Sequence, residues 1–430
     1  MASNETRNAK TISGSDRPYG PLALFTFVFA PFATGYFLSF LYRSINALIA
    51  PDLIVELGAT SSTLGLLTAG FFLGFAAMQL PLGIMLDRYG AARVQSVLLL
   101  VAALGAFMFA FAPNAATLIV ARALIGVGCA GGLMAAFKAI IRWFPPNRLA
   151  LVNGCYLAVG GLGAMAATKP AEAVLHLTDW RGLFVGLAVL TLFSATLIFL
   201  LAPRGDGAEN PPALKVQTRE ISKVFNDKLF WRVAPLSIFG MGGSMSIQTL
   251  WAGPWLTDAV DLGRDDVALR LLIMNTAVAL GFIASGGISD ALRARGVSTL
   301  HVMAGGTLVS MVALLAISLR IDASGWMHWA AFGFTCNVAA IVYAMLARHF
   351  GSAFAGRANT ANTLLVFGGT FLIQFAMGVV IDQWPRDAAG TYPTAAYQTA
   401  FGLVLVGLLL SLAWLYRPGA DKDEALSKAL

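Results

Sequence analysis

The segment that decides the fold reads Gly83-Ile84-Met85-Leu86-Asp87-Arg88-Tyr89-Gly90-Ala91-Ala92-Arg93 and follows a long apolar run. A related segment, Gly286-Gly287-Ile288-Ser289-Asp290-Ala291-Leu292-Arg293-Ala294-Arg295-Gly296, follows a second apolar run. Asp87 and Asp290 are 203 residues apart, close to half of the 430 residues, and Asp179-Trp180-Arg181 precedes Asp382-Gln383-Trp384 by the same 203. Two pairs of related segments with one spacing indicate a duplicated unit.

The composition is that of a membrane protein. Hydrophobic residues make up 58% of the chain and charged residues 12%, against roughly 45–50% and about 25% in soluble domains. Apolar runs of about 20 residues cross a membrane as helices, and the period-two alternation of a membrane β-barrel is absent. We expect twelve membrane helices, at 22–55, 62–86, 91–112, 116–142, 148–172, 182–202, 232–257, 268–289, 299–319, 326–347, 358–381 and 396–416.

The predicted fold is therefore an all-α integral membrane protein with two pseudo-symmetric six-helix bundles. The predicted organisation is an N-terminal tail at 1–21, a bundle at 22–202, a linker at 203–231, a second bundle at 232–417 and a C-terminal tail at 418–430.

Positive charge predicts the orientation in the membrane. With both termini on one side, that side receives 20 of the 29 Lys and Arg residues. Such an excess marks the cytoplasmic side, so we expect both termini in the cytoplasm and the protein in the inner membrane. The basic balance then reflects topology and anionic lipid, with no nucleic-acid partner. Cys129, Cys155 and Cys336 have no metal-ligand spacing, and we expect no metal or cofactor.

The segment at 83–93 resembles the signature loop of the major facilitator superfamily. Arg122-Ala123-Leu124-Ile125-Gly126-Val127-Gly128 resembles the fourth-helix motif of that family, and Trp143-Phe144-Pro145-Pro146-Asn147-Arg148 resembles its turn into helix five. The resemblance implies secondary transport by alternating access, with the substrate site between the two halves. We expect a monomer whose partners are a small anion and the lipid bilayer. Residues expected in conformational gating are Gly83, Asp87, Arg88, Gly90, Arg93, Asp290 and Arg293, with Asp87 attracting a helix N-terminus and Arg93.

Ionisable residues inside the membrane point to the substrate, because burying them is costly and usually functional. All 22 acidic residues fall in loops, tails or outermost helical turns, whereas Arg43, Arg122, Lys138 and Lys169 lie inside predicted helices. Cations without a buried acidic partner favour an anionic substrate. Arg122 has a structural alternative, in which it bonds backbone carbonyls, and both lysines are long enough to reach the membrane surface.

Tyr42-Arg43-Ser44-Ile45-Asn46-Ala47-Leu48-Ile49-Ala50-Pro51 resembles the first helix of the organophosphate antiporters and organic-anion symporters. The resemblance implies that Arg43 binds a phosphate or carboxylate, and Lys138 stands where many symporters carry an arginine. Two departures matter. The seventh helix has no cation at 246–251, which disfavours a phosphate dianion, and Cys129 stands where the symporters often carry a glutamate, which removes the expected proton carrier.

The second half offers polar rather than charged candidates. Position 246, which is 203 residues after Arg43, lies beside Gln248 and Trp251. Such side chains often make interhelical hydrogen bonds instead of binding ligands. The expected ligands in this half are Gln248, Trp251, Asn275, Asn337, Tyr343 and Asn362.

The sequence therefore predicts a secondary transporter of a small organic anion, a carboxylate in the first place, and not an enzyme. No Walker-type loop is present, and the four histidines lie near helix ends. An exporter of drugs or of another hydrophobic metabolite is the alternative within the same fold. Coupling is expected through anion exchange, or through a proton carried by the substrate or by an interfacial acid such as Asp52 or Glu56.

Overall fold

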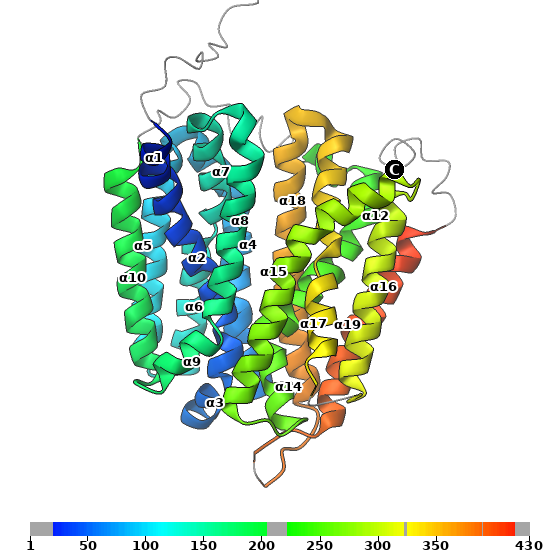
Figure 1. Cartoon of the computed structure of the whole chain (residues 1–430). Helices are drawn as coiled ribbons and strands as arrows, with labels where there is room; N and C mark the ends of the chain where they lie inside the picture. The colour runs from blue at the N-terminus through cyan, green and yellow to red at the C-terminus, as the bar shows by residue number, and fades with distance from the viewer. Residues whose placement is uncertain (1–19, 204–221, 322–324, 389, 418–430) are drawn as a thin grey trace, which may run out of the picture.

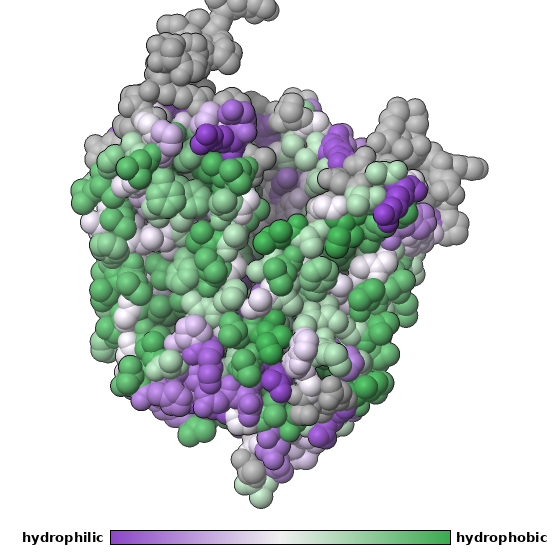
Figure 2. Space-filling model, in the orientation of Figure 1, coloured by the Kyte–Doolittle hydropathy of each residue, from purple (hydrophilic) through white to green (hydrophobic). Residues whose placement is uncertain are grey.

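The protein is described here from a computed structural model that covers residues 20–203, 222–321, 325–388 and 390–417. Its helices form two halves that stand side by side (Figure 1). α1 begins and α19 ends at one end of the molecule, here called the tail end, whereas the turns after α3, α9 and α14 lie at the opposite loop end. Figure 2 shows a broad hydrophobic belt between these ends, as expected for a surface that faces lipid.

The first half contains six membrane spans. They are α1 Pro21–Leu24, η1 Phe25–Phe29, α2 Ala30–Ser44 and α3 Asn46–Leu57; α4 Ser61–Tyr89; α5 Ala91–Ala110; α6 Ala115–Cys129 and α7 Gly132–Trp143; α8 Leu149–Ala166, after η2 Pro146–Arg148, and α9 Lys169–Leu175; and α10 Trp180–Leu201.

The second half repeats this order. Its spans are α12 Lys228–Leu236, η3 Ser237–Gly243, α13 Ser244–Ser246, η4 Ile247–Trp251 and α14 Ala252–Asp258; α15 Arg264–Ala294; α16 Thr299–Ser318; α17 Met327–Thr335, η5 Val338–Ala340 and the first part of α18 Ile341–Ile381; the rest of α18; and α19 Thr394–Leu415. α18 combines two spans, which are separated at Gly351 with φ 70°.

The predicted fold is confirmed within the described residues. Ten helices are long and apolar enough to cross a membrane, and α8 with α9 forms an eleventh span with a bend of 42°. The run of short helical segments at 228–258 supplies the twelfth. Individual limits differ from the prediction: the first span runs from Pro21 to Leu57, and α12 begins at Lys228, inside the predicted linker.

Polar side chains explain where several of the helices begin. Thr60, Asn114, Asp179, Asp227 and Ser298 each accept a hydrogen bond from a backbone N–H in the first turn of the helix that follows. Such caps satisfy donors that have no partner within the helix. These five helices therefore each begin directly after a polar capping residue.

The first, fourth, seventh and tenth spans are each interrupted along their length. The interruptions lie at Ile45, at 130–131, in the π-helical segments η3 and η4, and at 336–340. Irregular backbone at membrane depth is tolerated where it is enclosed by protein or lines a cavity. Ile45, Ala130 and Cys336, which lie at three of these interruptions, are buried.

Candidate functional site

Arg43 occupies the last turn of α2, two residues before the interruption at Ile45. Its side chain is buried, and its guanidinium carbon lies 4.4 Å from the ring centre of Phe40, 5.0 Å from Phe367, 5.4 Å from Phe75 and 5.9 Å from Phe71. These four rings form what we call the aromatic cage. Phe367 belongs to the second half, so Arg43 lies at the interface between the halves.

The cage lies near the middle of the membrane. Arg43 is 14 residues from the loop end of its span, Phe75 is 14 from the start of α4, and Phe367 is 14 from the end of α18. At 1.5 Å of rise per residue, each position is about 21 Å along its helix from the loop end. The three residues are therefore brought to one depth from three different spans.

Arg43 has no acidic neighbour in the part of the chain that the structure describes. The titratable side chains with which it interacts electrostatically are Tyr36, Cys129 and Tyr343. Its Nε atom is buried without a hydrogen-bond partner. A buried guanidinium without a counter-ion is destabilising unless an anion from elsewhere pairs with it.

Arg122 is enclosed within the first half. It is 1% exposed, donates a hydrogen bond of 2.8 Å to the carbonyl oxygen of Tyr42, and lies over the rings of Phe109 and Phe184. Of the two alternatives left by the sequence, these contacts favour the structural one. Cys129 interacts electrostatically with both arginines, so a thiol stands where a carboxylate would have neutralised them.

Lys138 lies at the tail end, away from the cage. Its Nζ atom is 2.6 Å from the Asp87 carboxylate and 2.8 Å from the carbonyl oxygen of Leu86. Asp87 therefore pairs with Lys138 of α7 and not with Arg93, the partner that we expected from the sequence, because α7 ends beside the C-terminus of α4. Both residues belong to the first half.

The remaining residues expected in gating are placed as follows. Gly90 has φ 81° and forms the turn between α4 and α5, and Gly296 repeats this with φ 82° after α15. Such backbone is favourable only for glycine. Arg88 and Arg93 are exposed at the tail end, and Gly83 has open space around it. The side chains of Asp290 and Arg293 lie outside the described part of the structure.

The expected ligands in the second half divide by accessibility. The side chains of Gln248 and Tyr343 are half-buried, and they contact Asn275 at 2.7 Å and Thr363 at 3.1 Å. Gln248 lies in η4 and Asn337 lies in the interruption of the tenth span, so both are at interrupted positions, like Arg43. Asn337 is 8% exposed and contacts Cys336.

The other candidates are packed inside the second half. Trp251 is fully buried and donates a hydrogen bond of 3.2 Å to the carbonyl oxygen of Gln374. Asn275, besides its bond with Gln248, donates to the carbonyl oxygen of Leu271. Asn362 is fully buried, and its amide has no hydrogen-bond partner among the described residues.

The two halves are held together at the loop end by contacts that the sequence did not predict. The Asp382 carboxylate accepts hydrogen bonds of 2.9 and 2.8 Å from the backbone N–H groups of Ser61 and Ser62, the first residues of α4. An acidic group at a helix N-terminus is stabilised by the helix dipole and by unpaired N–H groups. Asp382 thereby fixes the end of the second half to the start of α4 in the first.

The start of α15, which is equivalent to the start of α4 in the repeat, also joins the halves, through ion pairs. Arg264, 203 residues after Ser61, binds both Asp52, at 2.7 and 2.8 Å, and Glu172, at 2.8 Å. Lys169 pairs with Asp265, the neighbour of Arg264. The 203-residue spacing relates Ser61 to Arg264 as the first residues of α4 and α15, but it does not identify the partners that they bind.

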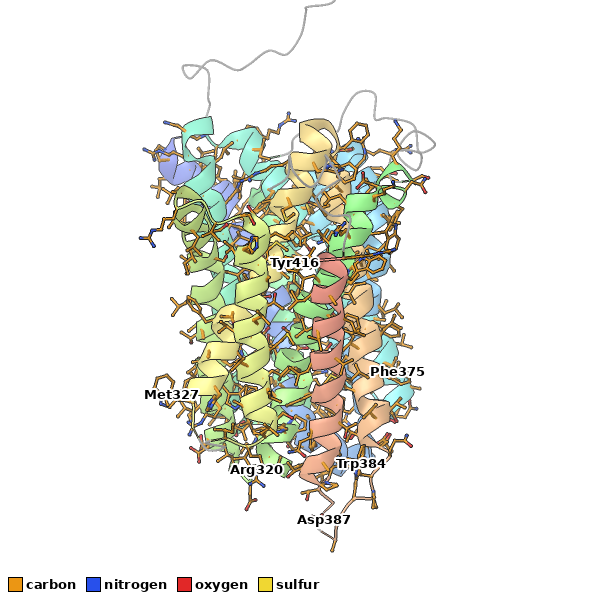
Figure 3. All side chains as sticks on the ribbon, turned by 90° about the vertical axis from the view of Figure 1, so that its right-hand side faces the viewer. Arg320, Met327, Phe375, Trp384, Asp387 and Tyr416 are labelled. Atoms are coloured by element: carbon orange, nitrogen blue, oxygen red, sulfur yellow. The ribbon has the colours of Figure 1, made fainter. Side chains whose placement is uncertain are left out.

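The loop end is therefore closed. Figure 3 shows Arg320, Trp384 and Asp387 at this end, whereas Tyr416 lies toward the tail end. At the tail end the molecule is hollowed between the two halves, as Figure 2 shows. An arrangement that is closed at one end and hollow at the other is what alternating access requires of one of its two states.

Comparison with known proteins supports this description. The family model described as Major Facilitator Superfamily matches residues 32–373. The chain is 25% identical over 273 residues to a probable sulfoacetate transporter of Cupriavidus necator, with 60% of this chain and 64% of that protein covered. It is 23% identical to a putative tartrate transporter of Agrobacterium vitis, with 88% and 87% covered.

The fold is also found in solved structures. A bacterial homologue of the human lysosomal transporter Spinster aligns with a TM-score of 0.69 and 18% identity, with 90% of this chain and 95% of that chain covered. The duplicated six-helix halves, the signature loop and the family match over most of the chain agree, and the chain belongs to the major facilitator superfamily.

Proposed function

We propose that this protein is a secondary active transporter that moves a small organic anion, a carboxylate or a similar acid, across the inner membrane by alternating access. Arg43 is the residue that binds the anionic group. The observation that carries the proposal is a buried guanidinium at the interface of the halves with no acidic neighbour in the described structure. The similarity to proteins named as sulfoacetate and tartrate transporters supports an acidic substrate.

The orientation follows from charge. Lys and Arg residues concentrate on the side of the termini, and positive charge stays in the cytoplasm. The tail end then faces the cytoplasm, and the structure is closed to the outside and hollow toward the inside. The loop-end contacts of Asp382 and Arg264 break when the transporter opens outward.

Transport by the purified, reconstituted protein tests the proposal. Uptake or exchange of anions from a panel of metabolites is expected, and Arg43→Ala or Arg43→Gln should abolish it without loss of expression. Arg43→Lys should retain little activity, because an ammonium group does not reproduce bidentate contact with a carboxylate. Transport confined to lipophilic cations, or full activity of Arg43→Ala, would reject the proposed function.

A further inference from the structure

The number of accessible cations limits the charge of the substrate. Lys138 is paired with Asp87 and Lys169 with Asp265. Arg122 is 1% exposed and bonded to Tyr42 inside the first half. Among the described residues near the middle of the membrane, Arg43 is thus the cation at the interface that an anion can approach.

The second half provides no second cation at the equivalent place. The residue 203 positions after Arg43 is Ser246, which is fully buried and bonds to the carbonyl oxygen of Gly242 at 2.9 Å. A second negative charge on the substrate would enter the site without a partner, and an unpaired buried charge is costly.

The walls of the site are apolar. Phe40 comes from α2, Phe71 and Phe75 from α4, and Phe367 from α18. Phe75 and Phe367 stack at 4.1 Å with an interplanar angle of 19°, and this stack joins the halves beside Arg43. The ring faces partly compensate the guanidinium charge when no anion is present. They also offer apolar contact to the body of a bound anion.

Two polar side chains expected as ligands in the second half are engaged within that half. Gln248 bonds to Asn275, and Tyr343 bonds to Thr363. Buried amide groups without a hydrogen-bond partner are also present, at Asn46 Oδ1 and at Gln374. The ring contacts at Arg43, and not a lack of polar groups, therefore favour an apolar body.

We propose, building on the function proposed above, that the substrate is a monoanion with an apolar or aromatic body, and not a dianion. Its carboxylate or sulfonate pairs with Arg43, and its body lies against the aromatic cage in place of part of the present ring contacts.

Binding to the full-length protein tests this substrate class. The probes are benzenesulfonate, gluconate and 1,3-benzenedisulfonate, which differ in apolar body and in charge. The two sulfonates stay ionised at all working pH values, so a neutral form that leaks across the bilayer does not confuse parallel flux measurements. Titration calorimetry should give benzenesulfonate at least about tenfold tighter binding than either of the other two.

Substitution of one ring of the aromatic cage distinguishes an effect on substrate preference from a loss of protein stability. Phe367→Leu keeps an apolar side chain but removes the ring, and it should lower the preference for benzenesulfonate over gluconate several-fold. Phe193→Leu is the matched control, because Phe193 of α10 is 59% exposed on the outer surface, and it should leave the preference unchanged. Melting temperatures of both variants report whether the fold is intact.

The outcomes are distinguishable. Tighter binding of gluconate or of the disulfonate, with binding still dependent on Arg43, would overturn the substrate class and leave the proposed function standing. An unchanged preference in a folded Phe367→Leu variant would also overturn it. If none of the three anions binds and no anion is transported, both the proposed function and the proposed substrate class are rejected.

Discussion

Gly253 of α14 lies directly against the backbone of Ala47 in α3, and a methyl group on Gly253 would come within 2.0 Å of the Ala47 carbonyl oxygen. This carbonyl lacks its usual helical partner, because Pro51 follows four residues later and has no N–H. The two residues belong to different halves. Their contact joins the two halves at the closed loop end of this structure.

Gly253→Ala should disfavour this closed state. The atom in the way is a backbone oxygen, which cannot rotate aside, and overpacking of this kind typically costs about 1–3 kcal/mol. The measurement is labelling of a cysteine at Ala59, which is 4% exposed at the loop end, by an impermeant maleimide in a Cys155→Ser background. Labelling should be faster in Gly253→Ala.

Gly305→Ala is the control for that experiment, since a methyl group at Gly305 meets no atom within 4 Å. In the Gly305→Ala variant the cysteine at position 59 should be labelled at the same rate as in the parent. Equal labelling of Gly253→Ala and Gly305→Ala would mean that the α3–α14 contact does not limit closure.

The two membrane arginines should differ in their effect on stability. Arg122→Gln removes a charge-assisted hydrogen bond to the Tyr42 carbonyl, worth about 1.5–3 kcal/mol, and should lower the apparent melting temperature in detergent. Both substitutions relieve a buried charge, but Arg43→Gln removes no hydrogen bond within the described structure, so its melting temperature should stay closer to that of the parent. A lower melting temperature for Arg43→Gln than for Arg122→Gln would assign the structural role to Arg43 and make Arg122 the stronger candidate ligand.

The sequence was sufficient for the architecture because hydropathy and a 203-residue repeat depend on local pattern. It also identified Arg43, since a lone cation in an apolar run is a local signal. It could not show the surroundings of Arg43. Phe40 is three residues away on the same helix, but Phe75 and Phe367 come from other spans, and no spacing rule connects them.

The contacts at the loop end could not be predicted for the same reason. Arg264 looked like an ordinary residue of an external loop, and only the packing of α15 against α9 and α3 shows that it binds Glu172 and Asp52. Gln248 and Trp251 are three residues apart in the π-helical turn η4, and they contact different spans. Gln248 contacts α15, whereas Trp251 contacts α18.

Asp382 should make closure of the loop end sensitive to strong acid only. Burial raises the pKa of this carboxyl, but hydrogen bonds from Ser62, Tyr392 and Ser61 outweigh burial and hold the pKa below its ordinary value. A lowered folded-state pKa contributes stability above the unfolded value near 3.9, and this stability is lost as the pH falls through the folded value. The contribution of Asp382 to the melting temperature should therefore stay constant between about pH 5.5 and 8.

Asp382→Asn provides the comparison for that pH dependence. It should lower the melting temperature at neutral pH, because a neutral amide no longer carries the charge that the start of α4 stabilises. The difference between the variant and the parent should shrink below about pH 4, as the pH falls toward the lowered pKa of the parent carboxyl. A difference that persists unchanged at pH 3 would show that the charge of Asp382 is not what holds the helix start.

Transport should be driven by exchange of anions rather than by a proton gradient. No acid lies near Arg43 in the described structure, and the interfacial acids are engaged: Asp52 pairs with Arg264, and Glu56 pairs with Arg181. A potential of 100 mV, negative inside, opposes entry of a monoanion by about 2.3 kcal/mol, or roughly fifty-fold in concentration.

The decisive measurement is flux into liposomes in which the pH gradient, the voltage and the internal counter-anion are varied separately. Internal anion should stimulate uptake, one-for-one exchange of monoanions should ignore voltage, and a pH gradient alone should drive no uphill uptake. An Asp52→Asn/Glu56→Gln double variant should still exchange anions, at a rate changed by the loss of the Arg264 ion pair, with Asp266→Asn, an exposed loop-end acid, as the control. Uphill uptake driven by a pH gradient alone, and still present in the double variant, would reject exchange, because it would require a proton-binding group elsewhere in the chain.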